Sequence, residues 1–329
     1  MTKRPAPKPR RPARSRPVSA PRVFDSIPLA AGRKAHPPIG LGLWGLGRWT
    51  AEDEARTKAT IGRAYEKGIR WFDTAEVYGG GRSERILGEV LHRATGGADD
   101  AFVVTKVSWE HLRPAQVRAS LINSLERLAR RSVDLYLVHA PDPRVPLAET
   151  MPALEALWKE GKVGAIGVSN FTVDDLEAAA KHLSETRIAV NQVRYNLLDR
   201  DDGDPVREYC RSHGILLEAY TPLARGLLNG RYLDGQRIPA NVRRLSERLL
   251  EPQRAKETLT RARAIRDLAT EAGLSTASIA LHWLRRQGAV PVFGASRPGQ
   301  VDENLAAWAT PPDEALLVRA EALARGDRA

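Results

Sequence analysis

Cysteine is nearly absent from the sequence, because Cys210 is the only one among 329 residues. A disulfide within the chain and a metal site built from several cysteines are therefore excluded, and a reducing compartment such as the cytoplasm fits best. Long apolar runs are missing as well. No stretch approaches the roughly 18 uninterrupted apolar residues that a membrane-spanning helix needs. We therefore expect a cytoplasmic globular protein whose 42% of apolar residues build a core.

Acidic residues are missing from the first part of the chain. Residues 1–22 hold eight Lys and Arg and no Asp or Glu, so removing them from the net charge of +11 leaves only +3 for the rest. Proline recurs there and aliphatic residues are rare, which predicts a disordered basic arm before a single domain at 23–329. The charge of the arm allows weak, nonspecific contacts. A solubilising tail fits better, and no dedicated nucleic-acid or membrane partner is expected.

Short β-branched runs alternate with longer amphipathic segments from residue 39 onward. The expected strands are 39–44, 70–74, 101–107, 133–139, 163–169, 188–194, 215–220 and 289–294. The expected helices are 52–67, 83–93, 114–130, 147–160, 173–183, 204–213, 256–272 and 299–308, with an extra one that begins after Ser275. Strict alternation of eight strands with helices predicts parallel strands and, for this count, a closed (β/α)8 TIM barrel.

The glycine-rich turn of an open dinucleotide-binding sheet is also missing. Such a sheet carries G-x-G-x-x-G after its first strand, with an acid about twenty residues later. Here the glycines of 40–47 alternate with apolar residues instead. The doubly wound open sheet is therefore the less favoured architecture.

One connection is unusually long for a compact domain. Residues 224–253 separate the seventh expected strand from the next helix, where roughly two to six residues are usual. We expect this segment to lie at the C-terminal face of the barrel and to act as a cofactor or substrate flap.

Polar side chains stand where the apolar strands end, which is the rim that carries active sites in TIM barrels. Asp73 ends the second expected strand, and Tyr78 follows in the next loop. Lys106 lies near the end of the third strand and His139 ends the fourth. Each of these residues alone is more often structural than catalytic. Together they bring a carboxylate, an amine, an imidazole and a phenol to one rim.

This set of side chains predicts a proton donor that faces a polarised carbonyl group. A phenol has a pKa near 10, and an adjacent ammonium lowers that pKa. Asp73 would keep Lys106 charged, and a neutral imidazole at His139 would orient the oxygen of a substrate. No nucleophile with a paired base stands out, and no cluster has metal-ligand spacing. Because no side chain supplies a hydride, a reducing cofactor is implied.

The motifs that contain these residues resemble those of the aldo-keto reductases. From about residue 39 to 304 they run in family order and spacing: GLGLWGLG, FDTAEVYGGGRSERILGEVL, VVTKV, SVDLYLVHAPDP, GKVGAIGVSNF, NQVRYNLLDR, AYTPLARGLL and GASRPGQVDEN. The resemblance implies a TIM barrel that binds NAD(P)H in extended form. It also implies reduction of an aldehyde or ketone to an alcohol by the tetrad Asp73, Tyr78, Lys106 and His139, with Tyr78 as the general acid.

The same resemblance implies a set of cofactor contacts. Ser169, Asn170 and Gln192 would hold the nicotinamide amide, and Tyr220 would stack on its ring. The pyrophosphate and adenosine would be held, in turn, by Thr221, Leu223, Arg225 and Gly226, and by Ser296, Arg297, Gln300, Glu303 and Asn304, where a helix N-terminus favours phosphate. Gly294 and Gln300 replace a lysine and an arginine of one branch, which leaves Arg297 for a 2′-phosphate. NADPH is therefore favoured, with NADH as the alternative.

Trp44 and Trp109 fall where family members line the substrate pocket, although core packing is an alternative for each. A nicotinamide-binding regulatory subunit with little turnover is a second functional hypothesis, which the intact tetrad disfavours. A lyase or hydrolase barrel would need paired acids at the rim, but the acids at 201–204 are better interpreted as a solvated turn. No apolar seam on the helices predicts an oligomeric state.

Overall fold

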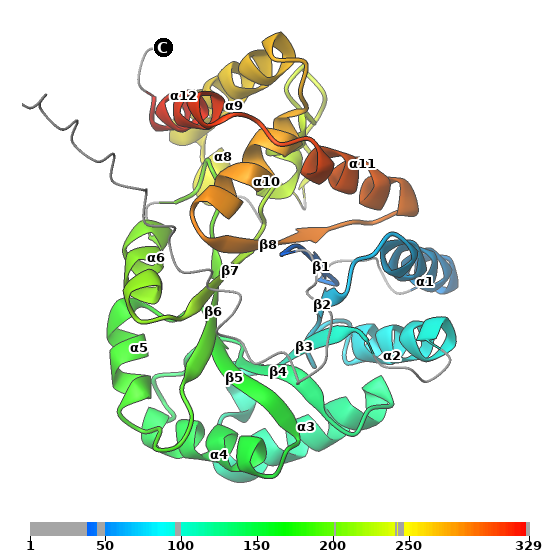
Figure 1. The fold of residues 1–329 in the computed structure, drawn as a ribbon, viewed down its shortest axis with the longest axis vertical. Helices are drawn as coiled ribbons and strands as arrows, with labels where there is room; N and C mark the ends of the chain where they lie inside the picture. The colour runs from blue at the N-terminus through cyan, green and yellow to red at the C-terminus, as the bar shows by residue number, and fades with distance from the viewer. Residues whose placement is uncertain are drawn as a thin grey trace, which may run out of the picture.

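The computed structural model describes residues 38–44, 50–95, 100–200, 202–240, 242 and 247–326. The predicted basic arm at 1–22 lies outside these residues. Eight parallel strands close into a barrel in chain order, and helices surround it (Figure 1). The strands are β1 (Gly40–Gly42), β2 (Trp71–Asp73), β3 (Phe102–Val107), β4 (Val133–Val138), β5 (Val163–Ser169), β6 (Ile188–Arg194), β7 (Leu216–Tyr220) and β8 (Ala289–Gly294). The predicted (β/α)8 fold is confirmed.

The helices form the outer layer around the barrel. They are α1 (Ala51–Glu66), α2 (Arg82–Thr95), α3 (Pro114–Leu128), α4 (Leu147–Lys159), α5 (Val173–Ala180), α6 (Gly203–Ser212), α8 (Glu247–Leu250), α9 (Pro252–Glu271), α10 (Thr276–Arg286), α11 (Pro298–Ala309) and α12 (Glu314–Arg325). Within the described residues, the 3₁₀ helices η2 (Trp109–His111) and η3 (Ala224–Asn229) lie in loops. No helix within the described ranges is long and apolar enough to cross a membrane.

Several helices begin with a side-chain cap. Thr50 accepts a hydrogen bond from the backbone N–H of Asp53, whose side chain bonds back to the Thr50 backbone, and Thr172 forms the same capping box before α5. Ser275 caps α10 as predicted, and Pro114 occupies the first turn of α3. Side-chain caps satisfy amide groups that would otherwise be unpaired, so the helix starts were readable.

α12 was not predicted, because the expected helices end with 299–308. Asp313 caps this helix by accepting the Leu316 N–H at 2.7 Å, and Gly326 ends it in a left-handed conformation. Leu317, Ala320 and other buried residues of α12 lie on one face and pack against α9 and α10. The cap, the spacing and the glycine were all present in the sequence.

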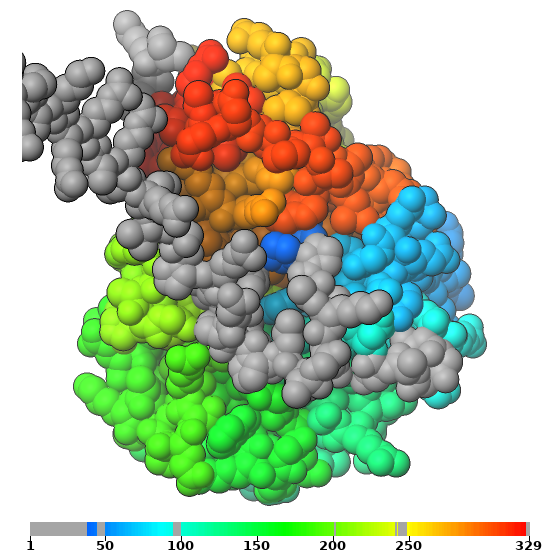
Figure 2. Space-filling model, viewed as in Figure 1, coloured from blue at the N-terminus to red at the C-terminus, as the bar shows by residue number. Residues whose placement is uncertain are grey.

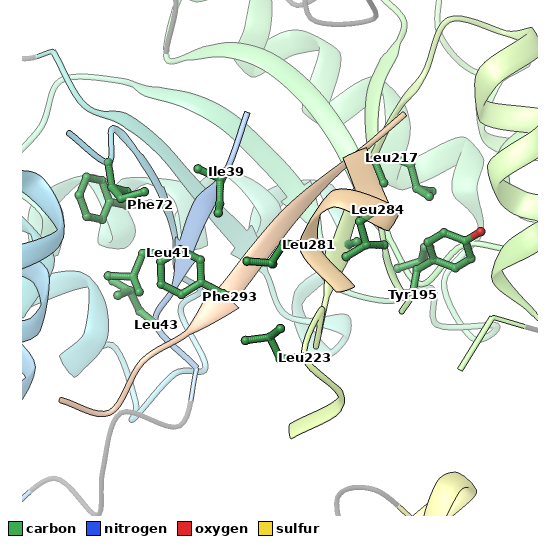
Figure 3. Close-up of a cluster of buried hydrophobic side chains, with 14 of the residues drawn as sticks. Ile39, Leu41, Leu43, Phe72, Tyr195, Leu217, Leu223, Leu281, Leu284 and Phe293 are labelled. Carbon is green, nitrogen blue, oxygen red and sulfur yellow. The ribbon is translucent and has the colours of Figure 1, made fainter. Parts of the chain in front are cut away.

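Two layers of apolar side chains build the core. Outward-facing residues of the strands pack against the helices, as Phe293 of β8 does near Leu281 of α10 (Figure 3). A second cluster fills the barrel itself and consists of Trp71, Phe102, Val104, Leu135, Leu137, Ala165, Val190, Leu216, Val290 and Val292. Because these residues fill the interior, a ligand has room only at the rim above them.

The ring of helices closes between its first and last members. Figure 2 shows α1, in blue, beside α11, in orange-red. Arg63 of α1 donates to Asp302 of α11 at 2.9 Å across this junction. Asp302 lies in the second turn of α11, so this ion pair joins α11 to the last turn of the helix that follows β1.

Candidate active site

Strand periodicity carries the tetrad side chains to the inside of the barrel rim. Trp71 and Phe102 belong to the interior cluster, and successive residues of a strand point to opposite faces. Asp73 on β2 and Lys106 on β3 are an even number of residues further along and therefore face inward too. Both are buried, and the Lys106 side chain has no exposed surface.

Lys106 connects the carboxylate to the phenol. Its Nζ donates to Asp73 Oδ2 at 2.6 Å and to the Thr74 carbonyl oxygen at 2.8 Å. It also donates to the Tyr78 Oη at 3.3 Å. The three donors of an ammonium group are thus all used, and a charged amine is fixed beside the phenol.

The triple glycine allows the chain to turn back after Tyr78. Gly79, Gly80 and Gly81 have φ angles of 61°, 63° and 85°, a region that side chains with a Cβ rarely adopt. At Gly81 a Cβ would also lie 2.5 Å from the Arg127 side chain. The turn brings the chain directly into α2 and leaves Tyr78 against the rim, 8% exposed.

The pKa of Tyr78 differs from the expectation. Burial raises the pKa of Tyr78 to about 12, because it outweighs the opposite effect of the Lys106 charge. The predicted lowering of the Tyr78 pKa is therefore wrong for the site as a whole. Burial also disfavours the charge of Lys106, but Asp73 and Tyr78 prevail and raise its pKa above the ordinary value. At neutral pH the phenol is a protonated donor beside an ammonium ion.

His139 is a neutral imidazole, as expected. Burial, together with the nearby positive charge of Lys106, lowers the pKa of His139 to about 3. The ring meets Tyr78 edge-on, with 5.5 Å between the centroids, and Trp109 from another direction at 5.7 Å. Its buried Nδ1 has no hydrogen-bond partner among the described residues. The ring is therefore held by packing rather than by a hydrogen bond to Nδ1.

The residues expected to hold a nicotinamide amide are tied into the same rim. Gln192 Nε2 donates to Asp73 Oδ2 at 2.8 Å. Asn170 has a φ of 61° and donates through Nδ2 to the His139 carbonyl oxygen at 3.0 Å and to Ser169 Oγ at 3.0 Å. Its Oδ1 accepts from the Tyr220 hydroxyl at 2.7 Å. These amides are thus orientated before any ligand binds.

A cavity of about 480 Å³ opens above the tetrad. Most of the predicted ligand-binding residues line it: Trp44, Asp73, Tyr78, His139, Ser169, Asn170, Gln192, Tyr220, Thr221, Leu223, Arg225, Gly226, Ser296, Gln300 and Asn304. Lys106 lies beneath it. Arg297 and Glu303 are not part of its lining and form an exposed ion pair of 2.8 Å. Trp109 lies at 41% exposure beside His139 rather than in the cavity wall.

The predicted flap forms one wall of this cavity. Its residues Arg225, Gly226, Asn229 and Arg231 line the space, but 224–229 form 3₁₀ turns on either side of a kink at Arg225 and Gly226 rather than an open loop. Ala224 and Arg225 have positive φ angles of 44° and 53°, which is strained for residues with a Cβ. The Arg225 guanidinium lies 4.6 Å from the centroid of the Trp44 ring, so it joins this wall to the opposite one after β1.

Sequence reasoning missed Glu218, a fully buried acid on β7. Trp71 Nε1 donates to its Oε1 at 3.0 Å from across the barrel. Burial, and then the charge of Asp73, raise the pKa of Glu218 to about 8. The signal for this residue was a single acid in the otherwise apolar run ILLEAY.

Comparisons of the sequence and of the structure with known proteins lead to the same family. A sequence model of the Aldo/keto reductase family matches residues 38–323. The aldo-keto reductase YhdN of Bacillus subtilis is 34% identical over 277 residues, which cover 80% of this chain and 82% of that protein. A glycerol dehydrogenase from Gluconobacter oxydans has a similar structure, with 28% identity, a TM-score of 0.79, and coverage of 88% of this chain and 92% of that one.

An aldo/keto reductase from Klebsiella pneumoniae, solved in complex with NADP and acetate, is also similar. It has 29% identity, a TM-score of 0.71, and coverage of 88% of this chain and 92% of its own. The family match spans the whole barrel, including all eight strands. The chain therefore belongs to the aldo/keto reductase family, oxidoreductases that act on carbonyl and alcohol substrates.

Proposed function

We propose that this protein transfers a hydride from NADPH, or from NADH, to an aldehyde or ketone, with Tyr78 as the general acid. The observation that carries this proposal is the Lys106 ammonium, which donates both to Asp73 at 2.6 Å and to the Tyr78 phenol at 3.3 Å at the floor of the cavity. A protonated phenol beside a fixed positive charge is able to give up its proton when a neighbouring oxygen becomes negative.

Each member of the tetrad has a separate task in this reaction. A reduced nicotinamide, when bound, supplies the hydride. Tyr78 donates its proton to the carbonyl oxygen, and the Lys106 charge stabilises the phenolate that remains. Asp73 keeps Lys106 charged. The neutral ring of His139 donates an N–H to the substrate oxygen and cannot compete as an acid, because its pKa of about 3 lies far below neutral pH.

The lining of the cavity supports a nicotinamide dinucleotide as the cofactor. Amide and hydroxyl groups adjoin the tetrad at Ser169 and Asn170, where a carboxamide would be held. Further along, Arg225 and Arg231 bring positive charge to the cavity wall. The start of α11 adds backbone N–H groups near Ser296, which favour phosphate.

Side chains in and beside the cavity support the proposed substrate class. Trp44, at 46% exposure, and Trp109 present apolar surface to solvent beside the tetrad, and Val77 is exposed next to Tyr78. Exposed aromatic side chains that flank polar groups suit a ligand with one apolar end and one polar end. We infer an aldehyde or ketone of modest size.

We predict that Arg297→Met weakens NADPH binding about tenfold more than NADH binding. Arg297 is the cation proposed for the 2′-phosphate, and a charge-assisted hydrogen bond contributes roughly 1.5–3 kcal/mol, less at an exposed site. Kd values for both cofactors, from quenching of tryptophan fluorescence, measure the ratio. Glu303→Gln is the matched control, because it frees Arg297 from its 2.8 Å ion pair and should shift the ratio toward NADPH. An unchanged ratio in both variants would remove Arg297 from this role.

An assay of the purified protein tests the proposed function directly. Oxidation of NADPH should be seen with 4-nitrobenzaldehyde as a generic substrate, followed by loss of nicotinamide absorbance. Quenching of tryptophan fluorescence by the cofactor, with no turnover across a panel of aldehydes and ketones, would instead favour a regulatory nicotinamide-binding subunit.

A further inference from the structure

The barrel interior contains a second carboxyl group that the proposed reaction does not use. Glu218 lies on β7 next to Gln192 of β6, and its side chain has no exposed surface. Trp71 donates to its Oε1 at 3.0 Å, while its Oε2 has no hydrogen-bond partner among the described residues. A carboxyl group buried this deeply is stable as an anion only if a cation faces it.

The cation of this region is already engaged. Lys106 Nζ donates to Asp73 Oδ2, to the Thr74 carbonyl oxygen and to Tyr78. On β8, the neighbour of Glu218 on its other side, the interior residues Val290 and Val292 are apolar. The polar and titratable groups that face Glu218 are Asp73 and Trp71 from β2, Tyr78 from the following loop, Lys106 from β3 and Gln192 from β6.

We propose that Glu218 is held in its protonated, neutral form beneath the tetrad, and that this neutrality keeps the phenol of Tyr78 able to release its proton. With Glu218 neutral, one ammonium balances one carboxylate, so the buried group of side chains has no net charge. An ionised Glu218 would add a second negative charge to that group. It would then oppose the phenolate that forms when Tyr78 gives up its proton. Glu218 is a positioning residue in this sense, because it acts through Tyr78.

The groups around Glu218 also determine the pH range in which Glu218 is neutral. Burial and the Asp73 carboxylate raise the pKa of Glu218 to about 8, so the neutral form predominates at neutral pH and is lost above it. Tyr78 keeps its proton over that range, because its pKa is about 12. A change in activity near pH 8 would therefore arise from Glu218 and not from Tyr78 itself.

The protonation state can be measured in the cofactor-free protein by infrared spectroscopy. At pH 6 the wild type should show the carbonyl band of a buried carboxylic acid, which disappears as the pH rises through about 8 and is absent from Glu218→Gln. Glu84→Gln is the control, because Glu84 is also fully buried but is paired with Arg127 at 2.6 Å. That variant should keep the band. A band that is the same in the wild type and Glu218→Gln would overturn the proposal.

A second measurement covers the case in which Glu218→Gln does not fold. Carbon-13 NMR of the wild type, with labelled glutamate, should show one side-chain resonance that titrates near pH 8. If every glutamate titrates near its ordinary pKa, Glu218 is ionised at neutral pH and the proposal is wrong.

The effect on Tyr78 rests on the proposed function and is tested by the pH profile of kcat for carbonyl reduction. The wild-type kcat should fall above pH 8, by up to about tenfold per pH unit. The kcat of Glu218→Gln should stay constant over the same range, because the amide of glutamine does not ionise. Identical profiles for the two proteins would contradict the coupling to Tyr78. Because the infrared and NMR readouts need no turnover, they remain decisive even if no substrate is reduced.

Discussion

Replacing Tyr78 by phenylalanine should lower kcat for carbonyl reduction by about 10²–10⁴-fold, the range that a positioned general acid contributes. The ring would remain in its pocket against His139, where the centroids are 5.5 Å apart, so only the proton donor is lost. Lys106 does not replace the phenol as proton donor, because Asp73 stabilises the ammonium ion and raises the pKa of Lys106. Initial rates of NADPH oxidation, together with cofactor Kd from fluorescence quenching, separate the chemistry from binding.

The matched control for this variant is Tyr136→Phe. Tyr136 is a fully buried tyrosine on β4 that faces the helices and donates to the Val117 carbonyl oxygen at 3.4 Å. Its loss should leave kcat within a few-fold of the wild type, and cofactor affinity should be unchanged in both variants. If Tyr78→Phe also retained wild-type turnover, Tyr78 would not be the acid.

Replacing Lys106 by methionine should have a large effect on both stability and turnover. The substitution leaves Asp73, which is 4% exposed, without its cation, and breaking a buried ion pair in this way costs about 3–5 kcal/mol in the free energy of unfolding. Turnover should be lost as well, because no charge remains to stabilise the Tyr78 phenolate. Chemical denaturation and the NADPH assay measure the two effects.

The double variant Asp73→Asn with Lys106→Met distinguishes the two effects. Removing both charges takes away the unpaired carboxylate, while an asparagine oxygen can still accept from Gln192 Nε2. We expect the double variant to regain most of the lost stability and none of the lost turnover. A double variant as unstable as Lys106→Met alone would show that the ion pair does not explain the cost. Recovery of turnover would remove Lys106 from the proposed mechanism.

Strand ends and their alternation made the tetrad predictable. Asp73, Lys106 and His139 follow apolar runs on three consecutive strands, and a parallel barrel brings such ends to one rim. The same alternation places Glu218 on the face of Tyr220, because the two residues are two positions apart on β7, so its inward direction followed once Tyr220 was assigned to the rim. The partners of Glu218 were not readable, because Trp71 and Gln192 come from other strands.

The burial of the site residues, and its effect on their pKa values, could not be predicted from the local sequence. The motif VVTKV placed an ammonium near Tyr78, and the sign of that single interaction was correct. The extent of desolvation depends on how the loop after β2 packs against His139 and the rim, so the net rise in the Tyr78 pKa was not readable. Likewise, nothing in ARGLL signals that Ala224 and Arg225 adopt positive φ angles.

Deuterium transfer tests the central claim of carbonyl reduction most directly. With NADPH that carries deuterium at both C4 positions of the nicotinamide, the wild type should place one deuterium on the carbinol carbon of the alcohol formed from 4-nitrobenzaldehyde. A wild-type protein that binds this NADPH but delivers no deuterium to any carbonyl compound of a broad panel would contradict the account.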